Sequence, residues 1–436
     1  TGVYNTIMGG LAGDSLTTGG RNVAIGYRAL QAEDAHGYNV AIGYKALQTQ
    51  DAGANGYNVA IGYDVAQAVT TGINNVLIGG SAGYAMTTGS YNIAIGKNAM
   101  GVGVADSASG YNIAVGVDAG KSITTSRFNI ILGGEAGDAL TTGGSNIAIG
   151  HAALSLEDGH GLNVAIGHGA LGTLDAGADA YNVAVGYSAG NLMSTGVYNT
   201  LIGGLAGDAL TTGSNNVAIG YQALSTEDAH GRNVAIGYQA LTVQDAGADA
   251  YNVAIGYDTG TALQTAIRST LVGGQAGSAI TTGSENTFIG WTTGGATTIG
   301  NKNVAVGGEA MTTNVAANAN VAIGIEALKT MTSAVGLNTY NTAIGHNAGK
   351  AVTSGVENTI IGGQAGDALT TGGYNVAIGY KALSSEEAYG KNVAIGHQAL
   401  ELQNAGDYAY NVAVGQNAGK LVSTGVKNVI MGGLAA

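Results

Sequence analysis

The sequence contains no cysteine and no proline, and it has only one tryptophan and two phenylalanines. Without cysteine there is neither a disulfide framework nor a thiolate site. Seventy-seven glycines with neither proline nor a G-X-Y period exclude collagen. Only 10% of the residues are charged, 28 acidic against 15 basic, so the net charge of -13 predicts no nucleic-acid partner. No run of 18 apolar residues occurs, which predicts no membrane insertion.

The chain has instead one short stretch, Asn-Val-Ala-Ile-Gly-Tyr at 22–27, that returns slightly altered along its length. Its Asn occurs 24 times, with Ser269 once in its place, at a spacing of 17 almost everywhere and 19 to 21 at a few places. A fixed period of this size predicts the stacked turns of a solenoid. We therefore predict one continuous all-β, parallel β-solenoid (β-roll) over residues 1–436, with about 25 turns of 17 residues.

A variant with two glycines after the apolar run, as at 7–10, divides the turns into groups. Its spacing is 70 in four places, which corresponds to a super-repeat of four turns. One turn is missing between Asn75 and Asn129, and one is added between Ser269 and Asn358. A solenoid tolerates the loss or gain of a whole turn because each turn contacts only its neighbours.

Within a turn, Val and Ile alternate with Ala and Gly, as at 23–26, which is the period-2 pattern of a strand with a large and a small face. A second apolar element follows at 29–30, and we predict a second short strand there. A strand-plus-helix turn is the alternative, because residues 29–34 are compatible with a helix. Gly and Asn are expected to make every corner, since they tolerate positive φ.

The predicted core is thin. Each turn offers about three large apolar side chains, worth roughly 5–9 kcal/mol when buried. Ordering 17 backbone residues costs on the order of 17–34 kcal/mol. The Ala/Gly face is flat enough for another chain to approach closely. We therefore expect several copies of the chain to pack side by side along a rod on the order of 120 Å long.

Asn-Val-Ala-Ile-Gly, at 22–26, 39–43, 58–62 and 216–220, resembles the Ser-Val-Ala-Ile-Gly repeats in the heads of trimeric autotransporter adhesins. The stretch at 139–154 is similar to repeat arrays of bacteriophage tail-fibre proteins and related bacterial surface proteins. The resemblance covers essentially the whole chain. It implies a homotrimer of left-handed parallel β-rolls that forms a fibre, on a virion or an extracellular surface, and attaches to a cell-surface glycan or protein receptor.

The adhesin repeat is commonly shorter than the repeat of this chain, which favours the tail-fibre arrays. A structural shaft of a tail fibre is therefore the predicted function. One alternative is an adhesin head or an extracellular filament subunit built from the same repeat. Another is a monomeric solenoid that binds glycan or ice, since paired threonines such as those at 17–18 recur in some turns.

Two columns of side chains stand out. The recurring Asn is predicted to form a structural ladder of stacked amides, although a polar binding strip is the alternative; its members include Asn22, Asn39, Asn58 and Asn216. Tyrosines occur five residues after many of these Asn residues, with His in some turns. Exposed aromatic rows can stack on sugar rings, or on one another to stabilise neighbouring turns. The candidate glycan contacts are Tyr27, Tyr44, Tyr63, Tyr221, Tyr238 and Tyr257.

An acidic loop with a histidine recurs in phase, and its first copy is Glu33, Asp34 and His36. Carboxylate and imidazole groups together are plausible metal ligands, whereas a solvated edge that blocks sideways aggregation is the alternative. In the copy at 386–389 a tyrosine replaces the histidine. Asp14 lies in a stretch that partly resembles a calcium-binding nonapeptide. These are weak candidates, and we expect neither a metal nor a cofactor.

Little in the sequence indicates an enzyme. No Walker-type phosphate loop is present. The Gly-x-Ser-x-Gly pattern occurs at 79–83 and 186–190, but both copies fall in the Gly-rich corner of the repeat rather than in a strand-turn-helix context. The other polar groups recur as columns, whereas catalytic sites are normally singular. We therefore predict that the chain is not an enzyme.

Overall fold

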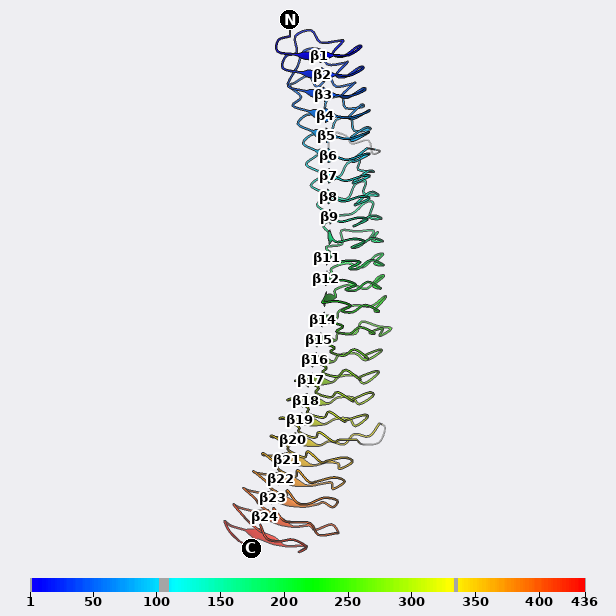
Figure 1. The fold of residues 1–436 in the computed structure, drawn as a ribbon. Helices are drawn as coiled ribbons and strands as arrows, with labels where there is room; N and C mark the ends of the chain where they lie inside the picture. The colour runs from blue at the N-terminus through cyan, green and yellow to red at the C-terminus, as the bar shows by residue number, and fades with distance from the viewer. Residues whose placement is uncertain (1, 102–109, 333–335, 436) are drawn as a thin grey trace. The chain divides into compact units, whose positions relative to one another are not determined.

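The computed structural model describes residues 2–101, 110–332 and 336–435, in two units, Thr1–Asn216 and Val217–Ala436, which we describe one at a time. Each unit is a parallel β-solenoid with one three-residue strand in each turn. Within each unit, Figure 1 shows the strands following one another in chain order. The predicted all-β parallel β-solenoid is confirmed. The described residues include no helix long and apolar enough to cross a membrane.

The first unit contains β1 to β12, and each strand pairs in parallel with the next. Equivalent residues lie opposite each other, as Val23 and Val40 do. The repeat therefore fixes the register. The strands are β1 (Thr6–Met8), β2 (Val23–Ile25), β3 (Val40–Ile42), β4 (Val59–Ile61), β5 (Val76–Ile78), β6 (Ile93–Ile95), β7 (Ile113–Val115), β8 (Ile130–Leu132), β9 (Ile147–Ile149), β10 (Val164–Ile166), β11 (Val183–Val185) and β12 (Thr200–Ile202).

The second unit contains β13 to β25 and repeats this arrangement. Val217 lies opposite Val234, and Ala218 opposite Ala235. The strands are β13 (Val217–Ile219), β14 (Val234–Ile236), β15 (Val253–Ile255), β16 (Thr270–Val272), β17 (Thr287–Ile289), β18 (Val304–Val306), β19 (Val321–Ile323), β20 (Thr342–Ile344), β21 (Thr359–Ile361), β22 (Val376–Ile378), β23 (Val393–Ile395), β24 (Val412–Val414) and β25 (Val429–Met431).

The central residue of each strand from β2 to β24 is buried in the core, and the two flanking residues face outward. In β2, Ala24 is fully buried, whereas Val23 and Ile25 are half-buried. The prediction that the flat Ala/Gly face lies outside is therefore wrong. The reason is the narrow cross-section of the turn: Leu30, fully buried on the opposite wall, leaves room for only a methyl group at the strand centre.

The segment at 29–30 forms a turn, so the prediction of a second strand is wrong. Arg28 and Leu30 have φ angles of 58° and 49°, which curl the chain instead of extending it. The Leu30 amide donates a hydrogen bond to the Ala46 carbonyl, 2.9 Å away in the next turn. Hydrogen bonds between turns thus stabilise backbone conformations that cost a non-glycine residue about 1–3 kcal/mol.

The prediction that only Gly and Asn make the corners is also wrong. The residue before the recurring Asn has positive φ in many turns, and it is often tyrosine, as in Tyr38 with φ 65°. Glycine is nevertheless required at Gly26, where φ is 128° and an added Cβ would overlap the Gly43 carbonyl of the next turn.

In many turns, side-chain volumes at two core positions compensate each other. In other turns both residues are small, as Ala114 and Gly120 are, and a side chain of the next turn, here Ile131, fills the space. Where the strand centre is Ala24, the residue six positions later is Leu30; where the strand centre is Leu77, that residue is Gly83. A Cβ on Gly83 would lie 3.1 Å from Leu77 Cδ1, so the larger strand residue fills the space of the missing side chain. Every described pair with a bulky strand centre follows this rule: Ile7/Gly13, Leu77/Gly83, Ile131/Gly137, Leu201/Gly207, Leu271/Gly277, Phe288/Gly294 and Ile360/Gly366.

Candidate functional site

The Asn ladder lies inside the solenoid, at the corner before each strand. Asn22, Asn39 and Asn58 are fully buried. The Asn39 backbone amide donates to Asn22 Oδ1 at 3.0 Å, and the Asn58 amide donates to Asn39 Oδ1 at 3.2 Å. Farther along, the Asn216 amide donates to Asn199 Oδ1 at 2.9 Å. Buried side chains that hydrogen-bond the neighbouring turn hold the corner together and offer no surface to a ligand.

The six candidate tyrosines form two stacks of three rings on the surface. In the first stack, the ring centroids of Tyr27 and Tyr44 are 5.6 Å apart, and those of Tyr44 and Tyr63 are 5.1 Å apart. The second stack repeats this, with centroid distances of 5.8 and 5.3 Å among Tyr221, Tyr238 and Tyr257. The middle ring of each stack has both faces covered, so only its edge meets solvent.

The last ring of a stack is more exposed than the others. The equivalent position in the next turn, five residues after the recurring Asn, is a glycine and has no ring to cover it. Tyr44 is 39% exposed, whereas Tyr63 is 61% exposed. The next column position is Gly80, and an added Cβ there would meet no atom within 4 Å. At the other end of the stack, a Cβ on Gly10 would lie 3.5 Å from the Tyr27 ring. The first stack therefore leaves one ring face open, on the side of Gly80. In the second stack the last ring, Tyr257, is 58% exposed, and a Cβ on the following Gly274 would lie 3.7 Å from Trp291.

Two further open rings were not among the candidates. Tyr187, 61% exposed, ends a stack that begins with His151 and His168. Trp291, 60% exposed, occupies the same column, and Gly308 follows it with no atom near its added Cβ. Aligning the column by turn would have found both, since each large ring is followed by a glycine.

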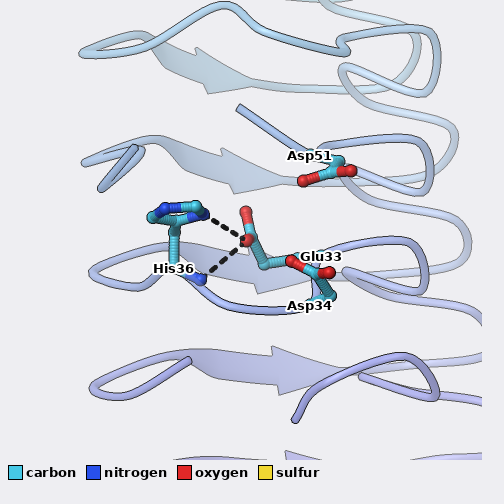
Figure 2. A group of neighbouring side chains, drawn as sticks. All are labelled: Glu33, Asp34, His36 and Asp51. Carbon is cyan, nitrogen blue, oxygen red and sulfur yellow. Dashed lines mark hydrogen bonds and ion pairs between the residues drawn. The ribbon is translucent and has the colours of Figure 1, made fainter. Parts of the chain in front are cut away.

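The acidic loop gathers four side chains from two turns. Glu33, Asp34 and His36 come from the turn after β2, and Asp51 comes from the turn after β3. One potential ligand atom from each lies within 4.8 Å of all the others. Figure 2 shows the Glu33 carboxylate pointing toward the His36 ring. The predicted loop residues are thus brought together, and Asp51 is an additional member that the sequence analysis missed.

Glu33 is the unusual member, because its side chain is fully buried while Asp34 and Asp51 are exposed. Glu33 Oε1 accepts a hydrogen bond from the His36 amide at 3.0 Å and lies 3.7 Å from His36 Nδ1. Glu33 Oε2 is buried and has no hydrogen-bond partner. Burial raises the pKa of Glu33 above its ordinary value.

Similar groups recur. Glu227, Asp228, His230 and Asp245 repeat the set of four in the second unit, with His230 Nδ1 3.6 Å from Glu227 Oε1. Burial raises the pKa of Glu227 to about 7. A third group of three side chains consists of Glu157, Asp158 and His160.

The copy at Glu386 departs from the others. Tyr389 occupies the histidine position and Asn404 the position of Asp51. Its buried glutamate is retained, and Oε1 accepts a hydrogen bond from the Tyr389 amide at 3.2 Å. Asp14, the remaining candidate, is exposed and belongs to none of the three groups found among the described residues.

The fold defines the chain as a β-solenoid repeat protein, whose surface carries aromatic columns and whose core holds an Asn ladder and recurring buried glutamates. A comparison with protein-family models gives no match. A comparison with curated proteins gives no significant relative. The function must therefore be argued from the geometry.

Proposed function

We propose that the chain is the shaft of a homotrimeric fibre for host or surface attachment, most simply a bacteriophage tail fibre. The outward face of the strands carries this proposal. Each strand presents two side chains on that face, and throughout the described strands these are Val, Ile, Leu, Met or Thr and never charged. A face of this composition, left half-exposed in one chain, is suited to contact an apolar surface.

The size of the face favours a long contact. Ile61 and Ile255 are 36% and 37% exposed and are among the more exposed outward residues of β2 to β24, most of which are half-buried. The exposed areas of the outward-facing side chains in β1 to β12 add up to an apolar stripe on the order of 1,000 Å². This is larger than the largest apolar patch on a typical monomer, which is roughly 300–600 Å². Association of such stripes is favourable because it removes apolar area from water.

A second copy of the same chain fits this face best. Its own stripe has the same repeat along the strands, so two stripes in parallel can interdigitate turn by turn. The choice of three copies, the left-handed winding and the place on a virion or cell surface rest on the resemblance to tail-fibre and adhesin repeats. An adhesin head or filament subunit would use the same face, and no catalytic step is part of the proposal.

The mass of the native particle tests this assembly. We expect light scattering to give three times the chain mass of 42.8 kDa. Ile61→Lys combined with Ile255→Lys places a charge in the outward face of each unit and should lower the mass toward one chain. Ala54→Lys, in an exposed loop of the first unit, should leave the trimer intact. A wild-type particle of 42.8 kDa would contradict the proposal.

The open aromatic faces favour a second function, the binding of surface polysaccharide along the shaft. An exposed ring with one free face is a platform for the apolar face of a pyranose, and polar groups beside it can bind hydroxyls. Asp64 provides a carboxylate next to Tyr63, and Asp258 provides one next to Tyr257. The recurrence of such platforms would let a polymeric glycan bind at several points with gain in avidity.

An array of bacterial surface polysaccharides tests the platforms. Tyr63→Ala, Tyr187→Ala and Tyr257→Ala together should weaken binding at least tenfold, since each removes the most exposed ring of its stack. Tyr44→Ala with Tyr238→Ala is the matched control, because both faces of these middle rings are already covered. Equal loss in the two sets would mean that the open faces play no special part.

A further inference from the structure

The group formed by Glu33, Asp34, His36 and Asp51 has the composition of a cation site. Three carboxylates and one imidazole combine hard oxygen donors with a nitrogen donor. Such a set suits first-row divalent ions such as Zn²⁺ or Mn²⁺ better than Ca²⁺, which prefers oxygen ligands alone.

The spacing of the potential ligand atoms is close to that around an ion. Ligand atoms bonded to Zn²⁺ at about 2.0–2.2 Å lie roughly 3.0–3.6 Å apart. His36 Nδ1 and Glu33 Oε1 are 3.7 Å apart, and all four potential ligand atoms lie within 4.8 Å of one another. Asp34 and Asp51 are exposed side chains, which can move inward by about 1 Å through rotamer changes. They also provide the entry path from solvent.

A second observation points to a ligand. Glu33 is fully buried, yet its Oε2 has no hydrogen-bond partner, and the buried His36 Nδ1 has none either. Leaving a buried carboxylate oxygen without a partner is costly, and a cation bound by the Glu33 carboxylate and the His36 ring removes that cost. The His36 amide, which donates to Glu33 Oε1 at 3.0 Å, holds the carboxylate in place.

The same arrangement occurs in the second unit, where Glu227, Asp228, His230 and Asp245 meet the same distance limit. Glu227 is also fully buried, and its Oε1 accepts a hydrogen bond from the His230 amide at 3.1 Å. Two turns far apart in the chain thus present the same four residue types in the same geometry.

The copy at Glu157 has these residue types too, with Asp175 in the position of Asp51, but Asp175 is outside the group that meets the distance limit. Glu157 Oε2 also accepts a hydrogen bond from the Ala176 amide at 3.3 Å, so we do not count this copy as a site.

We propose that these two groups, one in each unit, bind a first-row divalent cation, with Zn²⁺ as the probe ion. The glutamate and the histidine supply the inner ligands, and the two exposed aspartates complete the site. Each ion links two successive turns of its solenoid, because the fourth ligand comes from the following turn. This proposal is independent of the trimer and of glycan binding.

Zn²⁺ bound to the full chain can be counted by metal analysis after equilibrium dialysis against micromolar Zn²⁺ at pH 7.5. We expect two ions per chain. His36→Gln and His230→Gln should each remove one ion or weaken its binding at least about tenfold, and the double variant should remove both. His397→Gln is the matched control, because His397 stacks on Tyr380 and lies outside the groups of four.

A gain of binding provides the converse test. Tyr389→His, Glu387→Asp and Asn404→Asp together give the copy at Glu386 the four residue types of the two proposed sites. Glu386 Oε2, like Glu33 Oε2, has no hydrogen-bond partner, so the triple variant should add a third ion. Unchanged Zn²⁺ content in the His36→Gln/His230→Gln variant would overturn the proposal. Absence of bound Zn²⁺ from the wild-type chain would do so too, as would full displacement of Zn²⁺ by an equal concentration of Ca²⁺.

Discussion

Replacing Phe288 by Ala should lower the free energy of unfolding by about 3–5 kcal/mol, and replacing Gly294 by Leu should be comparably damaging. The first change leaves a cavity where a fully buried ring was. The second places a side chain where even a Cβ would overlap that ring. The double variant Phe288→Ala/Gly294→Leu should nevertheless regain most of the loss, because it recreates the Ala/Leu pair of the turn that contains Ala24 and Leu30.

The backbone at Gly294 permits the exchange. Its φ is 61°, close to the φ of 49° that Leu30 adopts at the equivalent position. Denaturant unfolding of the four proteins gives a double-mutant cycle, and we expect a coupling free energy of about 3 kcal/mol or more. Gly308 is a suitable control site: the side chain of Gly308→Leu points into open space and should change stability little. Additive losses in the cycle would show that the two positions do not share one volume.

The repeat made the strand positions and the Asn ladder predictable from sequence. One residue type recurring at a fixed period requires equivalent residues to stack, and Asn39 does stack on Asn22. The period-2 pattern of Val23, Ala24 and Ile25 also predicted two faces, but it could not say which one lies inside. That depends on the volume of Leu30 across the turn, which the pattern within the strand does not contain.

The candidate metal group was predictable only in part. Glu33, Asp34 and His36 are close in sequence, so the loop pattern found them. Asp51 joins them only through the stacking of successive turns. The burial of Glu33 could have been predicted from the repeat. Glu33 occupies the same position in its turn as Val69 and Met86 do in later turns, and both of these are buried. Aligning the turns would have marked that glutamate as a core residue.

The buried Glu386 should make the stability of the chain depend on pH between about 4.5 and 7. Burial raises its pKa in the folded state to about 7 from an ordinary value of 4.5. Over this range the folded chain keeps a proton that the unfolded chain has released, so stability falls as the pH rises and levels off above 7. The loss from this one group is on the order of 3 kcal/mol.

Glu386→Gln should remove this contribution, because the amide cannot ionise and its oxygen can still accept the hydrogen bond from the Tyr389 amide. We expect the variant to equal the wild type below pH 4.5 and to exceed it by about 3 kcal/mol at pH 8, measured by denaturant unfolding. Histidine ordinarily titrates in the same range, and this loop has none, because Tyr389 occupies the position of His36. Glu387→Gln, at the exposed neighbouring carboxylate, should shift the pH profile only slightly, because burial raises the pKa of Glu386 more than the Glu387 charge does. If Glu386→Gln left the profile unchanged, the buried glutamate would have to be ionised in the folded chain, stabilised by a partner such as a bound cation.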